Sequence, residues 1–348
     1  MERGVYIIFE RKVFLIVVLA LLAVVSVPVT VAFGTVYKPW EVLAGVLLGS
    51  SDVFQALMLR FRKALVALLV GALLGGAGVL TQASFRNQLA SPFTLGISSA
   101  SALGVAVALV LGVGGRGSSW FVSFSSPFVL ALFAFAFSIV QTLLVLLLAW
   151  RAGLDPRALV LASISLNFMY QAVLYLVQYL VLNEVQLATV VFWTFGDLGR
   201  AGWQELGVLL VGTPVFALAY LVLHRDLDLL VLGDDVAETS GINPRRARLI
   251  AVMVAALGAA LATSFVGILA FLCLLSPHVA RLLIGGRHKY LVSGSMLIGA
   301  LILVWADAVS RTVLSPVVLP VGITLSLTGA PLLIYLLTRG GGVGGYKG

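Results

Sequence analysis

Nine stretches of the sequence contain no Asp, Glu, Lys or Arg, and most of them are long enough to cross a lipid bilayer. A spanning helix needs about 20 apolar residues, because the hydrocarbon core is about 30 Å thick and each helical residue rises about 1.5 Å. Only 10% of the 348 residues are charged, whereas soluble globular chains carry about 25%. No polar stretch is long enough to form a soluble domain. We therefore expect one all-α polytopic membrane domain.

The number of spans depends on the stretch 249–280, which is too long for one helix and contains Pro277. Lys and Arg concentrate in cytoplasmic loops, so their distribution decides whether this stretch forms one helix or two. With ten helices and both termini cytoplasmic, 15 basic residues lie inside and 7 outside, whereas nine helices give 11 on each side. We therefore predict ten spans, at about 13–37, 64–85, 94–113, 127–150, 158–182, 206–224, 249–266, 268–284, 290–307 and 317–338.

Small residues recur four apart in two of these helices, at Gly71 and Gly75 and again at Ala256 and Ala260. In lipid, this spacing lets helix backbones approach closely. The constant offset of 185 residues indicates two related halves. An odd number of helices separates them, so one half would be inverted relative to the other, as in many transporters. Chance is the alternative explanation, because Ala and Gly are common in this chain.

The longest hydrophilic stretch is 225–248, between the sixth and seventh predicted helices on the cytoplasmic side. It contains an apolar run with a helical pattern, a further helical turn after Gly233, and Gly241 near its end. A solvated loop is one interpretation of such a charged segment. The helical pattern and the two glycine stops favour a docking element that lies along the membrane surface.

Four polar residues share one face of the fifth predicted helix, within an arc of about 80°. They are Ser163, Asn167, Gln171 and Gln178. Polar side chains inside a bilayer must contact protein or water. One interpretation is hydrogen bonding between helices, worth about 0.6 kcal/mol per contact. The other is the lining of a polar translocation path, and the stripe alone leaves both open.

The sequence lacks the residues that are characteristic of several function classes. Transporters driven by protons or sodium usually place carboxylates or His in mid-membrane, but Asp307 is the only carboxylate embedded in an apolar run, near the outer end of the ninth helix. The sequence has no G-x-x-x-x-G-K-[ST] motif, no apparent catalytic constellation and no apparent metal-ligating cluster. Inner loops near anionic lipid explain most of the net charge of +8, so no nucleic-acid partner is expected. If transport is driven, its energy would then come from another polypeptide or from another chemistry.

Six short motifs occur in a consistent order between residues 59 and 338. They are Leu59-Arg60-Phe61-Arg62-Lys63-Ala64; Arg86-Asn87-Gln88-Leu89-Ala90-Ser91-Pro92 with Leu95-Gly96; Leu232-Gly233-Asp234-Asp235-Val236-Ala237 ending at Ser240-Gly241; Ser276-Pro277-His278-Val279-Ala280-Arg281; Ala306-Asp307 with Arg311; and Leu319-Pro320-Val321-Gly322-Ile323 with Gly329-Ala330-Pro331. Read together, they resemble the cobalamin and ferric-siderophore permease family of type II ABC importers.

The resemblance implies a homodimer of ten-helix subunits in the cell membrane, with a pore along its two-fold axis. Two cytoplasmic ATPase subunits, which bind ATP and Mg, and an external substrate-binding protein would complete the importer. This chain would hold no cofactor and would not be an enzyme. The implied cargo is a metal chelate, first an iron–siderophore complex and otherwise haem or cobalamin. An oxyanion such as molybdate, or transport by an ion-coupled secondary mechanism, is the alternative.

The resemblance also implies a docking site for the binding protein at Arg60, Lys63 and Arg311. This site would explain basic residues on the outer side, where few are expected. Lys63 stands where the family usually has Arg, and Arg62 where it has Pro. A lysine cannot form the two-pronged contact with a carboxylate that an arginine forms. Contact with lipid headgroups is the alternative role for these basic residues.

On the inner side, the resemblance implies two further groups of functional residues. An inner gate would comprise Asn87, Leu89, Asp155 and Pro156, with Gln88 in place of the family's first proline; the alternative for Asn87 is to cap the third helix. The family also places helix five along the pore, which favours the lining role for its polar stripe. Contact with the ATPase would come from Gly233, Asp234, Asp235, Ala237, Glu238, Ser240 and Gly241.

Overall fold

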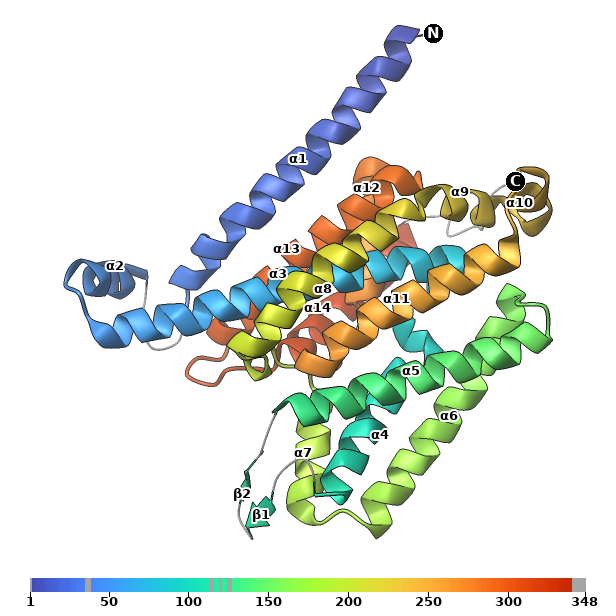
Figure 1. The fold of residues 1–348 in the computed structure, drawn as a ribbon. Coiled ribbons are helices and arrows are strands. Elements are labelled where there is room, and N and C mark those ends of the chain that lie inside the picture. The colour runs from blue at the N-terminus through green and yellow to red at the C-terminus, as the bar shows by residue number, and fades with distance from the viewer. Residues whose placement is uncertain (1, 35–38, 113–115, 119–120, 124–126, 340–348) are drawn as a thin grey trace.

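The computed structural model describes residues 2–34, 39–112, 116–118, 121–123 and 127–339, which form a helical bundle and a two-stranded hairpin (Figure 1). In chain order the elements are α1 (Glu2–Ala32), α2 (Pro39–Leu47), α3 (Ser51–Phe85), η1 (Pro92–Leu95), α4 (Ile97–Val110), β1 (Arg116–Ser118), β2 (Phe121–Ser123), α5 (Pro127–Arg151), α6 (Pro156–Leu180), α7 (Glu184–Thr194), η2 (Leu198–Arg200), α8 (Trp203–Val222), α9 (His224–Leu232), α10 (Asp234–Thr239), α11 (Pro244–Val266), α12 (Leu272–Ile284), α13 (His288–Thr312) and α14 (Val321–Arg339). Strands β1 and β2 are antiparallel.

Within the described ranges, seven helices are long and apolar enough to cross a membrane: α1, α3, α5, α6, α8, α11 and α13. Three shorter apolar helices, Ile97–Val110, Leu272–Ile284 and Val321–Tyr335, lie at the remaining predicted positions. A 14-residue helix such as α4 spans only about 21 Å, less than the hydrocarbon core. The all-α membrane architecture is confirmed, while the count of ten spans stays a prediction.

The centre of the bundle is α3, whose inner two-thirds is almost completely buried. It runs antiparallel to α13, and the two backbones are in contact: a Cβ atom on Gly71 would lie 2.4 Å from the Gly299 carbonyl oxygen, and one on Gly75 would lie 2.3 Å from that of Ser295. The Ser295 hydroxyl also donates to the Gly75 carbonyl at 2.7 Å. The predicted close approach at Gly71 and Gly75 is therefore present, with α13 as the partner.

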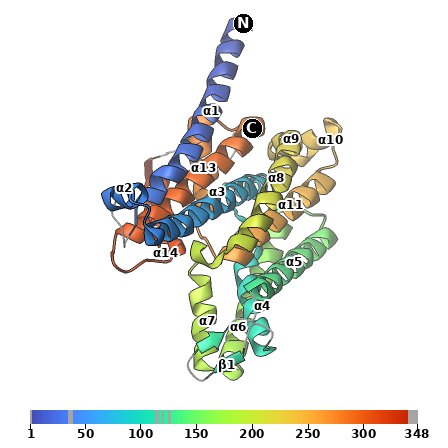
Figure 2. The ribbon, with the colours of Figure 1, turned by 60° about the vertical axis from the view of Figure 1, so that its left-hand side comes forward.

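The helices form two groups, which Figures 1 and 2 show side by side. One group surrounds α3 and includes α1, α8 and α11 to α14, while the other consists of α4 to α7. Helices α5 and α11 pack against each other and join the groups. Helices α9 and α10 lie at one end of the bundle, here called the inner end, and α2 and α7 lie at the opposite, outer end.

The observed helix boundaries differ most from the predicted ones at the outer end of the second predicted span. We predicted a start at residue 64, directly after three basic residues, but α3 begins at Ser51 and contains Arg60, Arg62 and Lys63 within its first four turns. The prediction was wrong because it ended each span at charged residues. Long basic side chains near a helix end can extend along apolar surface or bury against other groups. Residues 35–37 of the first predicted span lie outside the described residues.

The short helix α7 was not predicted. Its N-terminus is a capping box: Asn183 Oδ1 accepts from the Gln186 amide at 2.9 Å, and Gln186 Oε1 accepts from the Asn183 amide at 3.1 Å. This reciprocal pair satisfies two backbone donors that a helix start leaves free. The spacing Asn-x-x-Gln is therefore a sequence signal from which this helix start could have been predicted.

Candidate functional site

The predicted docking segment 225–248 forms two short helices and the first turn of α11. Gly233 separates α9 from α10 in a backbone conformation with φ of 128°, which favours glycine. On α10, Ala237 faces inward and is buried, whereas Asp235 and Glu238 are exposed. Ser240 and Gly241 follow on the same exposed turn. The exposed side of α10 is therefore acidic, with Leu232 (63% exposed) beside it, while Arg225, Arg245 and Arg246 are exposed elsewhere in the segment.

Asp234, the first residue of α10, is not part of this exposed surface. Its carboxylate accepts hydrogen bonds from Arg86, directly after α3, and from Arg248 in α11, the latter at 2.6 Å and 3.3 Å. Arg86 also donates from Nε to the Leu230 carbonyl in α9 at 2.7 Å. Burial raises the pKa of the Asp234 carboxyl, but the hydrogen bonds and charges of the two arginines outweigh burial and hold the pKa below its ordinary value.

Arg248 is fully buried and connects this carboxylate to two other segments. Its Nε donates to the Ser84 carbonyl at 3.1 Å, in the last turn of α3, and its Nη1 donates to the Leu154 carbonyl at 2.8 Å, just before α6. Every donor of a buried guanidinium needs an acceptor, and backbone carbonyls near helix ends provide them. We call Asp234, Arg86 and Arg248 the inner triad.

A second carboxylate holds the other short helix. Asp228 Oδ1 in α9 accepts from both the amide and Nδ1 of His288, at 2.9 Å and 2.7 Å. His288 is buried and starts α13. Burial raises the pKa of the Asp228 carboxyl, but the hydrogen bonds of His288 and the charges of His288 and Arg287 hold it below its ordinary value. Thus α9 is tied to α13 by Asp228 and to Arg86 by the Leu230 carbonyl, while α10 is tied to α3, α11 and the start of α6.

The predicted gate residues lie beside the inner triad. Asn87 Oδ1 accepts from the Leu89 amide at 2.9 Å, so Asn87 closes its own turn. Ser91 is the N-cap of the short helix η1 that leads into α4, and capping by Asn87 is therefore wrong. On α6, Asp155 Oδ1 accepts from the Arg157 amide at 2.7 Å, with Pro156 as the first helical residue.

A cavity of about 120 Å³ connects the gate turn to α6. The side chains of Asn87 and Leu89 lie on one side and that of Ser163 on the other. Leu89 is 46% exposed, whereas Ser163 is buried and its hydroxyl has no hydrogen-bond partner among the described residues. The structure thus brings the gate turn next to the inner end of the predicted polar stripe.

The rest of the stripe is only partly accessible. Asn167 Oδ1 accepts from the Ser99 hydroxyl of α4 at 2.7 Å, which is the interhelical role weighed above. Gln171 and Gln178 are half-buried. The most exposed face of α6 is apolar and aromatic, with Phe168 68% exposed. The lining role of Ser163, Asn167, Gln171 and Gln178 stays a prediction.

Two of the three predicted docking residues at the outer end are buried against α1. Arg60 Nη1 donates to the Val31 carbonyl at 3.3 Å, and Arg311 Nη1 donates to the Phe33 carbonyl at 3.0 Å. Arg60 is 8% exposed and Arg311 5% exposed. The last carbonyl groups of a helix lack partners within that helix, so these guanidinium groups satisfy the end of α1.

Two carboxylates accompany these basic residues. Asp307 Oδ2 lies 2.8 Å from Arg311 Nη2, and both side chains are buried. Asp197 Oδ1 lies 3.9 Å from Lys63 Nζ, whose side chain is 23% exposed. Lys63 is therefore the most accessible of the three predicted docking residues. The docking role of Arg60, Lys63 and Arg311 stays a prediction.

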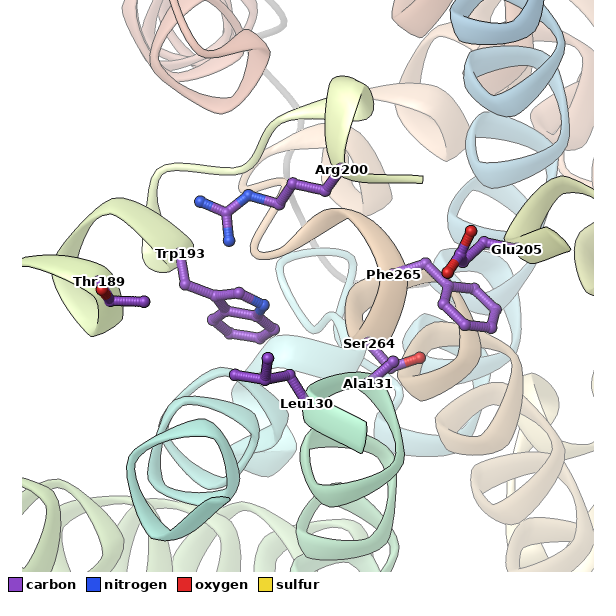
Figure 3. Close-up of a pocket in the computed structure, with 8 residues that line it drawn as sticks. All are labelled: Leu130, Ala131, Thr189, Trp193, Arg200, Glu205, Ser264 and Phe265. Carbon is purple, nitrogen blue, oxygen red and sulfur yellow. The ribbon is translucent and has the colours of Figure 1, made fainter. Parts of the chain in front are cut away.

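A larger cavity of about 190 Å³ lies at the outer end between the two groups of helices (Figure 3). Arg200 and Glu205 contribute its charged groups, but both bind backbone: Arg200 donates to the Phe192 carbonyl at 2.7 Å, and Glu205 accepts from the Gly202 amide at 2.8 Å. The remaining wall is largely apolar. The lining residues are Leu130, Ala131, Thr189, Trp193, Arg200, Glu205, Ser264 and Phe265.

A bundle of apolar helices with a helical inner segment joined to its central helix is the arrangement expected of a membrane-spanning permease subunit. Residues 15–339 match the model of the FecCD transport family, and the chain belongs to this family. It is the permease of an ABC transporter and not an enzyme, since the ATPase is a separate subunit. The chain is an integral protein of the cell membrane.

Curated relatives and a solved structure agree with this assignment. The chain is 33% identical to the Fe(3+)-citrate import system permease protein YfmE of Bacillus subtilis, over 94% of this chain and 96% of the relative. It is 36% identical to the hemin transport system permease protein HmuU of Yersinia pestis, over 81% of this chain and 83% of the relative. A structure described as an inward-facing metal-chelate type ABC transporter matches with a TM-score of 0.81 at 27% identity, over 94% of this chain and 99% of that one.

Proposed function

We propose that two copies of this chain form the transmembrane pathway of an ATP-driven importer of metal chelates, with an iron complex as the favoured cargo. Membership of the FecCD transport family carries the proposal. The cargo assignment is supported by two relatives, which are permeases of systems that import ferric citrate and hemin. Both termini would be cytoplasmic, which places the inner end of the bundle on the ATPase side.

The surface proposed for the ATPase is the exposed side of α10 and the turn after it. Asp235 and Glu238 provide acidic groups there, and Leu232 adds an apolar contact. Charged residues around an apolar centre are typical of the rim of a protein interface. Reversing both charges, in Asp235→Lys with Glu238→Lys, should reduce co-purification of the ATPase. The matched control is Glu184→Lys, which changes an exposed acidic residue at the outer end.

The inner gate would be the turn 87–90 together with the start of α6. The supporting observation is that Leu89 and Ser163 border one small cavity, so a movement of the turn would change access to α6. Gln171 and Gln178 would continue a neutral, amide-rich path toward the outer end. Such a path offers hydrogen bonds without a charge that would retain a charged chelate.

The outer docking site would use the positive charge of Arg60, Lys63 and Arg311 to attract acidic residues of a binding protein. Lys63 is the accessible member, while the two buried arginines add to the local potential and fix the end of α1. Complementary charge of this kind mainly raises the association rate, and salt weakens it. Docking should therefore weaken as ionic strength rises.

Uptake into sealed vesicles tests the proposed function. The chain is reconstituted with the ATPase and binding protein from its own source, and ferric citrate, haemin, cobalamin and molybdate are offered as separate probes. Uptake of an iron complex that requires ATP and persists with a proton and sodium ionophore is expected. ATP-dependent uptake of molybdate alone would replace the cargo assignment, and uptake that collapses with the ion gradient would indicate a secondary transporter.

A further inference from the structure

The buried charge of Arg248 requires Asp234 to stay beside it. Arg248 has no exposed surface, and Asp234 is the carboxylate that pairs with it. A buried cation left without its counter-ion is strongly destabilising. When an ATPase displaces α10, Arg248 and Asp234 are therefore expected to move together, because separating them is costly.

The other hydrogen bonds of Arg248 end at the two parts of the proposed gate. Ser84, whose carbonyl accepts from Nε, lies three residues before Asn87. Leu154, whose carbonyl accepts from Nη1, directly precedes Asp155. Arg86 adds a second path, because it pairs with Asp234 and is joined through the chain to Asn87. Movement at one carboxylate can thus reach both parts of the gate.

The neighbouring helix α9 shares one member of the triad and has a further anchor. Arg86 Nε donates to the Leu230 carbonyl of α9 at 2.7 Å, and Asp228 binds the buried His288 at the start of α13, the helix whose backbone contacts that of α3. Gly233, between α9 and α10, has φ of 128°, and a Cβ added there would meet no atom within 4 Å. The two short helices are therefore joined at Arg86, while the glycine between them can absorb a change in direction.

We propose that Asp234, Arg86 and Arg248 are positioning residues that transmit the displacement of α10 to both parts of the inner gate. The inference deepens the proposed function and rests on it. The inner triad would determine how far ATP binding moves the gate, while the ATPase contact itself stays with the exposed side of α10. Loss of the triad is therefore predicted to uncouple ATP hydrolysis from transport and to leave the ATPase bound.

The test compares Arg248→Lys with the matched control Arg151→Lys, at an exposed arginine that ends α5, in the complete transporter. Lysine keeps the charge but cannot reach the carboxylate and both carbonyls at once, because it lacks the planar fork of donors. Arg86→Gln provides a second variant if Arg248→Lys does not fold. Three quantities are measured: ATPase co-purification, substrate transported per ATP hydrolysed, and reactivity of a Leu89→Cys probe toward a membrane-impermeant thiol reagent. Native Cys273 is buried and should contribute little background.

In the parent, which carries only the Leu89→Cys substitution, ATP should change the reactivity of this cysteine toward the thiol reagent. Arg248→Lys or Arg86→Gln should keep the ATPase bound, lose this change, and lower transport per ATP by about tenfold or more, while Arg151→Lys behaves like the parent. The inference is overturned if the triad variants keep the parent's response, if they release the ATPase, or if Arg151→Lys uncouples equally. If the parent transports nothing with ATP, the proposed function itself fails.

Discussion

The Arg311 side chain joins two helices by donating to the Phe33 carbonyl oxygen at 3.0 Å while its own helix, α13, supplies Asp307 as counter-ion. The same guanidinium lies 3.5 Å from the Thr30 carbonyl. Helix α1 contacts the bundle mainly through α13 and α3, and its N-terminal part extends beyond them (Figure 1). Arg311 is therefore one of several residues, together with Arg60 and Trp305, that attach α1 to the bundle.

Arg311→Ala should lower the stability of the protein in detergent by about 3–5 kcal/mol, because it leaves Asp307 buried without a counter-ion. The thermal unfolding midpoint measures this effect. Arg311→Met combined with Asp307→Asn should recover part of the loss, since no unpaired charge remains. Arg151→Ala, at an exposed position, is the control, and an unchanged midpoint for Arg311→Ala would contradict the role of the pair.

Lys63→Glu should weaken docking of the binding protein by about tenfold at low salt, because it reverses the most accessible charge of the proposed patch. The new carboxylate would lie near Asp197, whose Oδ1 is 3.9 Å from Lys63 Nζ, so the thermal midpoint is measured alongside binding to separate docking from stability. Surface plasmon resonance on nanodisc-embedded protein measures binding. Lys289→Glu at the inner end is the control, and equal affinities for both variants and the parent would remove Lys63 from the docking site.

Gly75→Ala should destabilise the bundle by about 1–3 kcal/mol through overpacking. The added methyl group would lie 2.3 Å from the Ser295 carbonyl oxygen, so α3 and α13 would have to separate. Gly207→Ala is the matched control, because its Cβ would meet open space on α8. Thermal midpoints in the same detergent compare the two. Equal thermal midpoints for Gly75→Ala and Gly207→Ala would show that the α3–α13 contact tolerates an extra methyl group.

The stabilisation that Asp234 provides should depend on pH in one direction only. Its pKa is lowered on folding, so the stabilisation is present above the ordinary carboxyl pKa and is lost as pH falls through the lowered value. The difference in thermal midpoint between the parent and Asp234→Asn should therefore be constant from neutral pH to about pH 5 and shrink below about pH 4. A difference that grows on acidification would contradict this assignment.

The sequence predicted the membrane architecture because hydrocarbon thickness imposes a length on each apolar stretch. It also located α9 and α10, since Gly233 and Gly241 mark their ends in the sequence. The inner triad was missed because pairing is a property of the folded chain: Arg86 and Asp234 are 148 residues apart. The motifs located Arg60 and Arg311 in the sequence but did not predict that both are buried. A motif gives the position of a residue along the chain and not its exposure.

The glycine contacts of α3 set a limit on how this protein can work. Gly71 and Gly75 lie against the α13 backbone, and Gly78 lies against the Cys273 carbonyl of α12, so the middle of α3 can neither rotate nor slide without a steric clash. The last two turns beyond Gly78 have no glycine contact of this kind and are held instead by side-chain hydrogen bonds, from Arg281 to Gln82 and from Arg248 to the Ser84 carbonyl. The middle of α3 would then stay in place during transport. A small displacement at Arg86 would tilt only the last two turns of the helix, beside the gate.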